Sequence, residues 1–343
     1  MHYRALLLPA LPWEKIAGSS RSLTRDYDRY HEVLENPPQR LVFFGLLATL
    51  SLLWTPLGKT QEKQASPKTQ QSAFPVADTS VARYTAYRTV GIITIDGRLD
   101  ESTWKKVPQS PRFVDLISGN STIHSTRAAV SWDDTNMYVA YWVEEPFVEA
   151  TLKKRDSPIY NNNDVECFIA GKDAYYEFEI NSFGTIYEGF FIWQDSYASG
   201  GFSQTAEFQL TNPGAQPFNG VGFRNHPRGK RYAFLKWDFP GAQSAVHIDG
   251  TINQNNDRDR GWTAELAFPW KGMKWLAKSD GRSLPPRDGD RWRIDFSRFN
   301  QYKAAAPAKD SGGWAWSHHG VWDSHIPEAF PYVTFARKPP PSR

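Results

Sequence analysis

Cysteine and methionine are rare in this chain, which has one Cys and three Met among its 343 residues. The single thiol, Cys167, excludes an intramolecular disulfide and every zinc site that needs more than one cysteine. Cys167 stands in the apolar, strand-like run VECFIA, a setting typical of a buried thiol rather than of a nucleophile.

A large net charge of either sign is also missing, since the formal charge of the whole chain is +3. Residues 1–80 hold 9 Lys and Arg against 7 Asp and Glu, and the remaining residues hold 31 against 30. Nucleic-acid binding requires basic stripes that displace the counterions of the phosphates. Because the body of the chain is nearly neutral and has no run of Lys or Arg, we expect no nucleic-acid partner.

No apolar run is long enough for a full membrane span. The stretch LVFFGLLATLSLLW covers 14 residues from Leu41 to Trp54, which is the length of a signal-peptide core. We predict a targeting region over residues 1–58, with an apolar signal or anchor segment at 41–57. The forty residues before this segment are long for a signal, so either translation starts after Met1 or the segment is retained as a membrane anchor. The polar residues 59–80 predict a flexible linker.

Short stretches with alternating apolar and polar residues dominate the rest of the chain. In TRAAVSWDDTNMYVAYWVEE, a turn at Asp133–Asn136 separates two such runs and predicts a hairpin. In YYEFEINSFGTIYEGFFI, Tyr176, Phe178 and Ile180 share one face of a predicted strand, and Ser182–Gly184 form the turn. Regularly spaced strands with few helical stretches predict an all-β fold, an antiparallel β-sandwich over residues 81–338.

Six stretches between residues 92 and 335 carry a family resemblance. They are ITIDGRLDESTW, AVSWDDTNMYVAYWVEEP, RDSPIYNNNDVECFI, YYEFEINSFGTIYE, KWDFPGAQSAVHIDGTINQNNDRDRGWTAELAFPW and WSHHGVWDSHIPEAFPYVTF. Together and in this order they resemble the family 9 carbohydrate-binding modules. The resemblance implies an immunoglobulin-like or jelly-roll-type β-sandwich related to DOMON domains, which binds the ends of β-linked glycans and often contains structural calcium.

Candidate sugar-binding residues follow from the chemistry of the ligand. Sugars present apolar C–H faces and hydroxyl groups, so a site needs flat aromatic rings and polar neighbours. Binding residues concentrate on loops, and four aromatic residues are predicted on loops or at strand ends: Tyr160, Trp193, Trp316 and Trp322. Arg127, Glu179 and Asn181 are the candidate polar partners, although a solvated sheet face explains Glu179 equally well. Trp132, Trp142, Trp262 and Trp292 lie in alternating runs and are expected in the core.

Three histidines near the C-terminus raise the question of a metal or haem site. Adjacent residues of an extended chain point to opposite sides, so His318 and His319 would not face one metal together with His325. DOMON-related proteins include haem proteins, and Met137 and Met273 are the candidate methionine ligands for a haem iron. The chain has no C-x-x-C-H motif, so haem is the less favoured reading.

Calcium has its own candidate residues. Asn255, Asp257 and Asp259 alternate before Gly261, a spacing that lets several oxygens approach a hard cation. A polar hairpin loop that uses Asn and Asp for turn geometry is the alternative. Asp164 and Glu166, on one face of a predicted strand, form a second and weaker carboxylate pair.

The sequence as a whole predicts an exported carbohydrate-binding protein that recognises plant-type or other β-linked glycans, or their ends, in carbohydrate catabolism. Its expected partners are an oligo- or polysaccharide and a glycoside hydrolase, and its expected location is periplasmic, extracellular or membrane-anchored through residues 41–57. Two alternatives stay open, a hydrolase of O-glycosyl compounds and a haem-binding electron-transfer protein. The motifs G-x-S-x-G, the Walker loop and the dinucleotide fingerprint are absent, and no catalytic residue is assigned.

Overall fold

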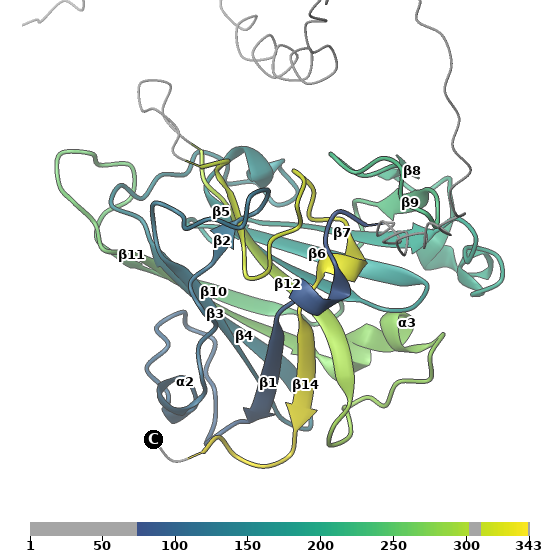
Figure 1. The fold of residues 1–343 in the computed structure, drawn as a ribbon, viewed down its shortest axis with the longest axis horizontal. Coiled ribbons are helices and arrows are strands. Elements are labelled where there is room, and N and C mark those ends of the chain that lie inside the picture. The colour runs from purple at the N-terminus through teal and green to yellow at the C-terminus, as the bar shows by residue number, and fades with distance from the viewer. Residues whose placement is uncertain (1–73, 302–309, 342–343) are drawn as a thin grey trace, which may run out of the picture. The chain divides into compact units, whose positions relative to one another are not determined.

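Strands make up most of the regular structure. The computed structural model describes residues 74–301 and 310–341 (Figure 1). The predicted targeting region 1–58, with its apolar segment 41–57, lies outside the described residues. Within the described ranges, no helix combines the length and the apolar character needed to cross a membrane.

One sheet of 14 strands runs through the described part of the chain. The strands are β1 Arg83–Arg88, β2 Val114–Asp115, β3 Thr126–Trp132, β4 Asn136–Glu144, β5 Asp164–Ala170, β6 Ala174–Asn181, β7 Ile186–Trp193, β8 Ala215–Phe218, β9 Arg231–Phe234, β10 Gln243–Asp249, β11 Gly261–Pro269, β12 Arg291–Phe299, β13 Gly313–Ala315 and β14 Tyr332–Ala336.

The helical elements are short and connect these strands. They are the α-helices α2 Ser102–Lys106 and α3 Lys274–Ala277, and the 3-10 turns η1 Asp78–Ser80, η2 Ile159–Asn161, η3 Phe202–Gln204, η4 Ala206–Phe208, η5 Trp270–Met273 and η6 Pro327–Ala329.

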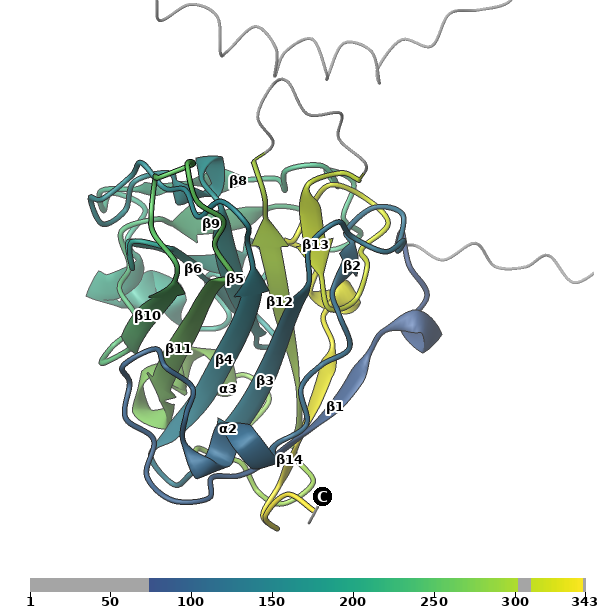
Figure 2. The same ribbon diagram turned by 90° about the vertical axis from the view of Figure 1, so that its left-hand side faces the viewer.

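The sheet folds back on itself, so that its two halves pack face to face. In one half β10, β11, β4 and β3 are neighbours, as Figure 2 shows, and in the other half β12, β5, β6 and β7 are neighbours. Aromatic rings meet between the halves: Tyr141 lies 6.2 Å from Phe296, and Phe268 lies 5.4 Å from Phe178. These contacts form the main core and give the two-layer arrangement expected of an all-β sandwich.

The prediction of a purely antiparallel sheet needs one correction. Strand β1 pairs in parallel with β14 and with β3, and β1 and β14 lie side by side (Figure 1). These pairs join strands that are not consecutive in the chain, so no hairpin turn forces them to be antiparallel. The sheet is therefore mixed.

Both predicted hairpins are confirmed. Strands β3 and β4 pair antiparallel, and the Asp133 amide closes their turn by donating to the Asn136 carbonyl at 3.0 Å. Strands β6 and β7 pair in the same way, with Tyr176, Phe178 and Ile180 in the core. Cys167 is buried in the core on β5, as its apolar surroundings indicated.

Three of the four tryptophans of the alternating runs are core residues, as predicted, and Trp142 is not. Trp132, Trp262 and Trp292 are buried in the main core. Trp142 is partly exposed and lies edge-on to Trp104 at 6.5 Å in a smaller cluster. The core prediction is therefore correct for Trp132, Trp262 and Trp292 and wrong for Trp142, which lies on the face of β4 opposite to that of Tyr141.

Residues before the predicted start of the sandwich pack against the body. Val76 is buried with Ile326 and Ala329. The Tyr332 hydroxyl donates to Asp78 Oδ1 at 2.7 Å, and Arg293 Nη2 lies 2.5 Å from the same oxygen. The folded body thus includes residues that the sequence placed in the 59–80 linker.

Candidate functional site

Acidic side chains gather on the outer face of β12, β5, β6 and β7, the face turned away from the main core. The register places Ser297, Glu166, Glu179 and Tyr187 in one row across these four strands. Asp164 lies one pleat further along β5, opposite Phe299 and Asn181. The alternation that sends apolar residues of these strands inward sends this polar row outward.

Two segments that are distant in the sequence cover this face. Asp323 fixes them to each other, because its Oδ2 accepts the amides of Val221, Gly222 and Phe223 at 2.9, 3.0 and 2.9 Å. Its Oδ1 accepts the His325 amide at 2.8 Å. As a result the outer face is buried, and Glu179 is only 2% exposed. The sequence interpretation of Glu179 as part of a solvated face is wrong for this reason.

Burial under these segments raises the pKa values of the carboxyls. Desolvation is the main cause for Glu166, whose pKa rises to about 8, although a hydrogen bond from Ser297 opposes the rise. Desolvation also raises the pKa of Asp164, Glu177 and Glu179 well above their ordinary values, and the charges of neighbouring carboxylates add to it. A low-dielectric face crowded with acids favours their protonated forms.

Two aromatic residues flank one end of this face. Tyr160, on η2, is 46% exposed, and its ring lies edge-on to Tyr187 at 5.7 Å. Trp322 is partly exposed and lies edge-on to Phe299 at 5.0 Å, while Phe299 pairs in register with Asp164. Gln301, two residues beyond Phe299, donates to the Tyr160 carbonyl at 3.1 Å. Both rings therefore border the edge of the sheet at which β5 begins and β12 ends, which we call the end of β5 and β12.

The other two predicted loop aromatics are not exposed. Trp193 ends β7 and is buried, with Arg231 at 4.8 Å and His226 at 4.3 Å from its ring. Trp316 is buried in the main core, 5.0 Å from Tyr84 and 5.1 Å from Phe296. Trp193 lies at the end of a strand, as predicted, but neither ring is exposed, because side chains from distant strands cover them.

The predicted polar partners lie apart from one another. Asn181 is buried at the end of β6, and its Oδ1 accepts the amides of Phe183 and Thr185, both at 3.0 Å. Asn181 thus holds the β6–β7 turn. Arg127 lies on β3, in the other half of the sheet, and donates to the Ser110 carbonyl at 2.7 Å. Of the three predicted partners, Glu179 stands in the acidic row.

The predicted calcium loop uses its oxygens within the protein. Asp259 is buried and accepts the amides of Val148 at 2.8 Å and Thr251 at 2.7 Å. Asp257 accepts the Thr251 hydroxyl, and Asn255 donates to Glu149. Among the described residues, the groups of acids close enough to share a cation do not include these three side chains.

The residue that follows this loop has a backbone role. Gly261 has φ of 134°, and a Cβ there would lie 1.9 Å from the Val143 carbonyl oxygen. Only glycine fits at this start of β11.

The three histidines have separate surroundings. His318 lies against Gly119, where a Cβ would come within 3.2 Å of its ring. His319 points inward, with its Nε2 3.4 Å from Asp295, and His325 Nε2 lies 3.4 Å from Glu177. Adjacent histidines thus face opposite sides, as the extended chain predicted. Met137 and Met273, the methionines considered for haem, are buried in the main core.

Tyr187 and Glu177 belong to the outer face but were not singled out from the sequence as site residues. Their signal was present, since both alternate with core residues in the predicted β6–β7 hairpin. The sequence did not show that other segments cover this face, because the segments near residues 221 and 323 are far from β6 and β7 along the chain.

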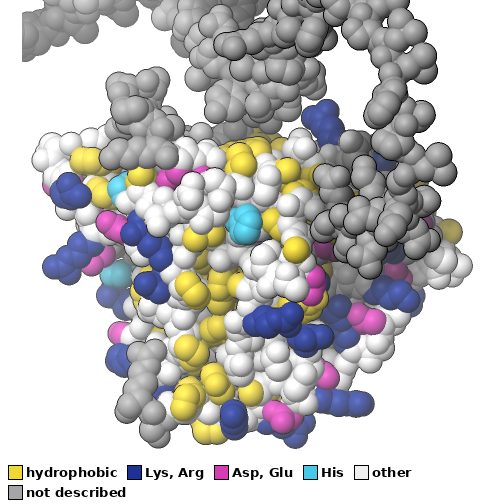
Figure 3. All heavy atoms as spheres, in the orientation of Figure 1, with side chains coloured by type: hydrophobic (Ala, Val, Ile, Leu, Met, Phe, Trp, Pro, Cys, Tyr) yellow, Lys and Arg dark blue, Asp and Glu magenta, His cyan; other side chains and the backbone are white. Residues whose placement is uncertain are grey.

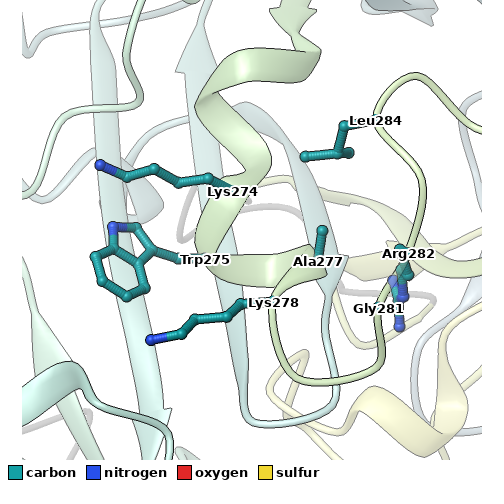
Figure 4. A pocket seen from close by; sticks show the side chains of 7 residues that line it. All are labelled: Lys274, Trp275, Ala277, Lys278, Gly281, Arg282 and Leu284. Atoms are coloured by element: carbon teal, nitrogen blue, oxygen red, sulfur yellow. The ribbon is translucent and has the colours of Figure 1, made fainter.

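A hollow lies on another part of the surface, beside α3. It has a volume of about 610 Å³ and is lined by Trp275, Lys274, Lys278 and Arg282 among others (Figure 4). Its cations are engaged: Lys274 pairs with Glu207 at 3.2 Å, and Lys278 donates to the Gly200 carbonyl at 3.0 Å. Charges of both signs intermix on the face drawn in Figure 3.

Comparisons with known proteins find one family model that matches part of the chain. Residues 95–196 match the model of the carbohydrate family 9 binding domain-like family. No curated protein matches the chain in sequence.

The chain is also similar to solved structures. One is a Bacteroides uniformis protein to which carbohydrate binding has been ascribed, with 14% identity, a TM-score of 0.47, and coverage of 75% of this chain and 100% of that one. Another is a family 9 carbohydrate-binding module of Caldicellulosiruptor kristjanssonii, solved with cellotriose: 13% identity, TM-score 0.40, coverage 74% and 94%. Its complex with glucose gives 13% identity, TM-score 0.41 and coverage of 76% and 99%.

The family match contains three of the six stretches that carried the resemblance in full and most of a fourth, Ile93–Trp104, and it contains Tyr160, Glu166 and Glu179. Residues 95–196 of this chain are therefore similar to the carbohydrate family 9 binding domain-like family.

Proposed function

We propose that this chain is an exported carbohydrate-binding protein whose site lies at the end of β5 and β12, between Tyr160 and Trp322. The observation that carries the proposal is that an exposed ring, Tyr160, and the row that contains Glu166 and Glu179 lie together inside the family-matched region. The ring of Trp322, from a distant part of the chain, borders the same end of the sheet.

The chemistry of this end suits a sugar. Aromatic rings stack on the apolar C–H faces of a pyranose, and polar side chains exchange hydrogen bonds with its hydroxyls. Asn161 and Gln301 are exposed beside Tyr160 and provide amide groups at the rim. The buried carboxyls Asp164, Glu166 and Glu179 lie on β5 and β6, the strands next to this rim. Modest affinity is expected, because desolvation of hydroxyl groups offsets much of the stacking gain.

The ligand that we propose is a plant-type or other β-linked glycan, or the end of one, which the protein recognises in carbohydrate catabolism. This class follows from the family resemblance. The apolar segment at 41–57 supports export to the periplasm or cell exterior, or retention at the membrane as an anchor. A glycoside hydrolase is the partner we propose for a binding protein of this kind.

One experiment separates this proposal from the two alternatives. Purified protein would be applied to a glycan array, incubated with the same glycans in a reducing-sugar assay, and scanned for visible absorption. Binding of β-linked glycans without release of reducing ends and without a Soret band is the expected result. Release of reducing sugar would indicate a hydrolase, and a Soret band would indicate haem. An array without any bound glycan would overturn the proposal.

A further inference from the structure

The sheet ends in two edge strands of different character. Its strand order runs from β10 to β8, so each of these two strands has a neighbouring strand on one side only. Strand β8 has four residues and includes Pro217, whose nitrogen carries no hydrogen. Short edge strands and prolines are two of the means by which proteins prevent an edge from pairing with another chain. The β8 edge is therefore protected.

The β10 edge has neither protection. Strand β10 has seven residues, QSAVHID, without Pro, Lys or Arg, and it pairs with β11 in a continuous antiparallel register without a bulge. Every second residue of an edge strand directs its N–H and C=O away from its only neighbour. Within the described ranges, no backbone hydrogen bond joins residues 243–248 to a segment other than β11. Figure 2 shows β10 beside β11 at the margin of this half of the sheet, where a further strand can pair with it.

The side chains of β10 also lack full cover. Val246 and Ile248 pack against the main core but remain partly exposed, whereas Ala264 and Trp262, which lie opposite them on β11, are buried. A strand paired to the free edge of β10 would remove more of this apolar surface from water, which favours association.

The charges at the two ends of β10 indicate which strand fits. Asp249 ends β10, and its contact with Arg260 at 3.5 Å is weak because both side chains are exposed. Lys271, exposed on η5, lies at the other end, where its Cε is 3.8 Å from the position that a Cβ would take on Gly241. If a second copy of β10 pairs in the antiparallel direction, its acidic end lies beside the basic end of the first copy. By symmetry this contact forms twice.

We propose that two copies of this chain pair through β10 as antiparallel strands and so join their sheets. Full overlap of the seven residues places Val246 opposite its own copy on the two-fold axis. Ala245 of one copy then lies opposite His247 of the other, and Asp249 lies beside Lys271. The proposal does not depend on carbohydrate binding, because the end of β5 and β12 belongs to the other half of the sheet.

Sedimentation velocity of the full chain at several concentrations tests this interface, in mild detergent because of the apolar segment at 41–57. We expect a dimer that dissociates on dilution. The variant Ala245→Lys/His247→Lys places like charges opposite each other in the paired strands and should remain monomeric. The control Gln216→Lys, at an exposed position of the β8 edge, should dimerise like the wild type. A wild type that is monomeric at every concentration, or a dimer that persists in the double-lysine variant, would overturn the proposal.

A charge exchange at exposed positions guards against a misfolded double-lysine variant. Asp249→Lys and Lys271→Glu each turn two attractive contacts of the dimer into repulsive ones, so each should weaken dimerisation by about tenfold. The two substitutions together restore opposite charges across the interface and should recover the wild-type dissociation constant. The melting temperatures of these variants, measured where the monomer prevails, should stay close to that of the wild type. A combined variant that dimerises no better than the single ones would contradict this pairing of the strands.

Discussion

Burial is the main reason that the pKa of Glu166 rises to about 8 from its ordinary 4.5. Between these values the folded protein keeps a proton that the unfolded chain has lost, so this residue reduces stability as pH rises. His325 acts in the opposite sense: burial lowers its pKa to about 3 from 6.5, so its contribution to stability is gained between pH 3 and 6.5. Above pH 6.5 His325 no longer changes, and the effect of Glu166 is left together with that of Asp164, Glu177 and Glu179, whose raised pKa values act in the same direction.

We therefore expect the metal-free protein to become less stable as pH rises from 6.5 to 8, with a contribution from Glu166 of up to about 2 kcal/mol. The raised pKa of His319, whose partner is Asp295, acts in the same direction. Thermal melts in chelator at several pH values provide the measurement. Glu166→Gln should flatten the dependence, and a wild-type melting temperature that climbs over this interval would show the sign to be wrong.

Trp132 ties three strands together in the core. Its ring is fully buried on β3, and its Nε1 lies 3.1 Å from the Ala86 carbonyl and 3.2 Å from the Ala336 carbonyl. Trp132→Ala should reduce the free energy of unfolding by about 3–5 kcal/mol through the cavity that it leaves. Denaturant unfolding measures this loss. Trp322→Ala, at a partly exposed ring, should cost less, and equal losses in the two variants would contradict the assignment.

Sequence reasoning succeeded for Trp132 and failed for Trp316, and the difference is physical. Trp132 lies in a long alternating run, where its neighbours reveal the inner face. Trp316 follows the short strand β13, and only the folded structure reveals that Tyr84 and Phe296 enclose it. A ring after a short strand carries no local signal for which side will be covered.

At the scale of elements, the strands of the outer face could be predicted but their cover could not. The predicted β6–β7 hairpin has the right turn and inner residues. Burial of Glu177 and Glu179 comes from segments joined by Asp323, which lies more than a hundred residues away along the chain. Such long-range contacts produce no pattern of apolar and polar residues in the sequence of β6, so the sequence cannot predict them.

The cover should depend on Asp323 in particular. Asp323→Ala leaves the amides of Val221, Gly222 and Phe223 without their acceptor. These donors are only partly buried, so we expect a loss near the lower end of the ~1–3 kcal/mol that an unsatisfied buried donor costs. We expect a lower melting temperature and faster amide hydrogen exchange in residues 218–226 and 316–326. Asp323→Asn, which keeps one carbonyl oxygen, serves as the milder control. Unchanged exchange in both segments of the alanine variant would argue against this role.

For the molecule as a whole, the structure extends the folded body to residues before the predicted boundary at 81. Val76 packs against Ile326 and Ala329, and Asp78 bonds with Tyr332 and Arg293. A chain starting at residue 81 should still fold, because the main core lies beyond it, but it should be less stable than one starting at residue 74. The expected difference is on the order of 1–2 kcal/mol. Equal denaturation midpoints of the two truncations would show that these contacts contribute nothing.

The most direct test of the proposed sugar site is a tryptophan fluorescence titration with cello- and xylo-oligosaccharides. We expect the wild type to give a saturable change, and Trp322→Ala and Tyr160→Ala to lose binding while keeping cooperative unfolding. Trp275→Ala, in the separate hollow beside α3, should bind like the wild type. Normal binding by the Trp322 and Tyr160 variants, or loss of binding only in Trp275→Ala, would contradict a site at the end of β5 and β12.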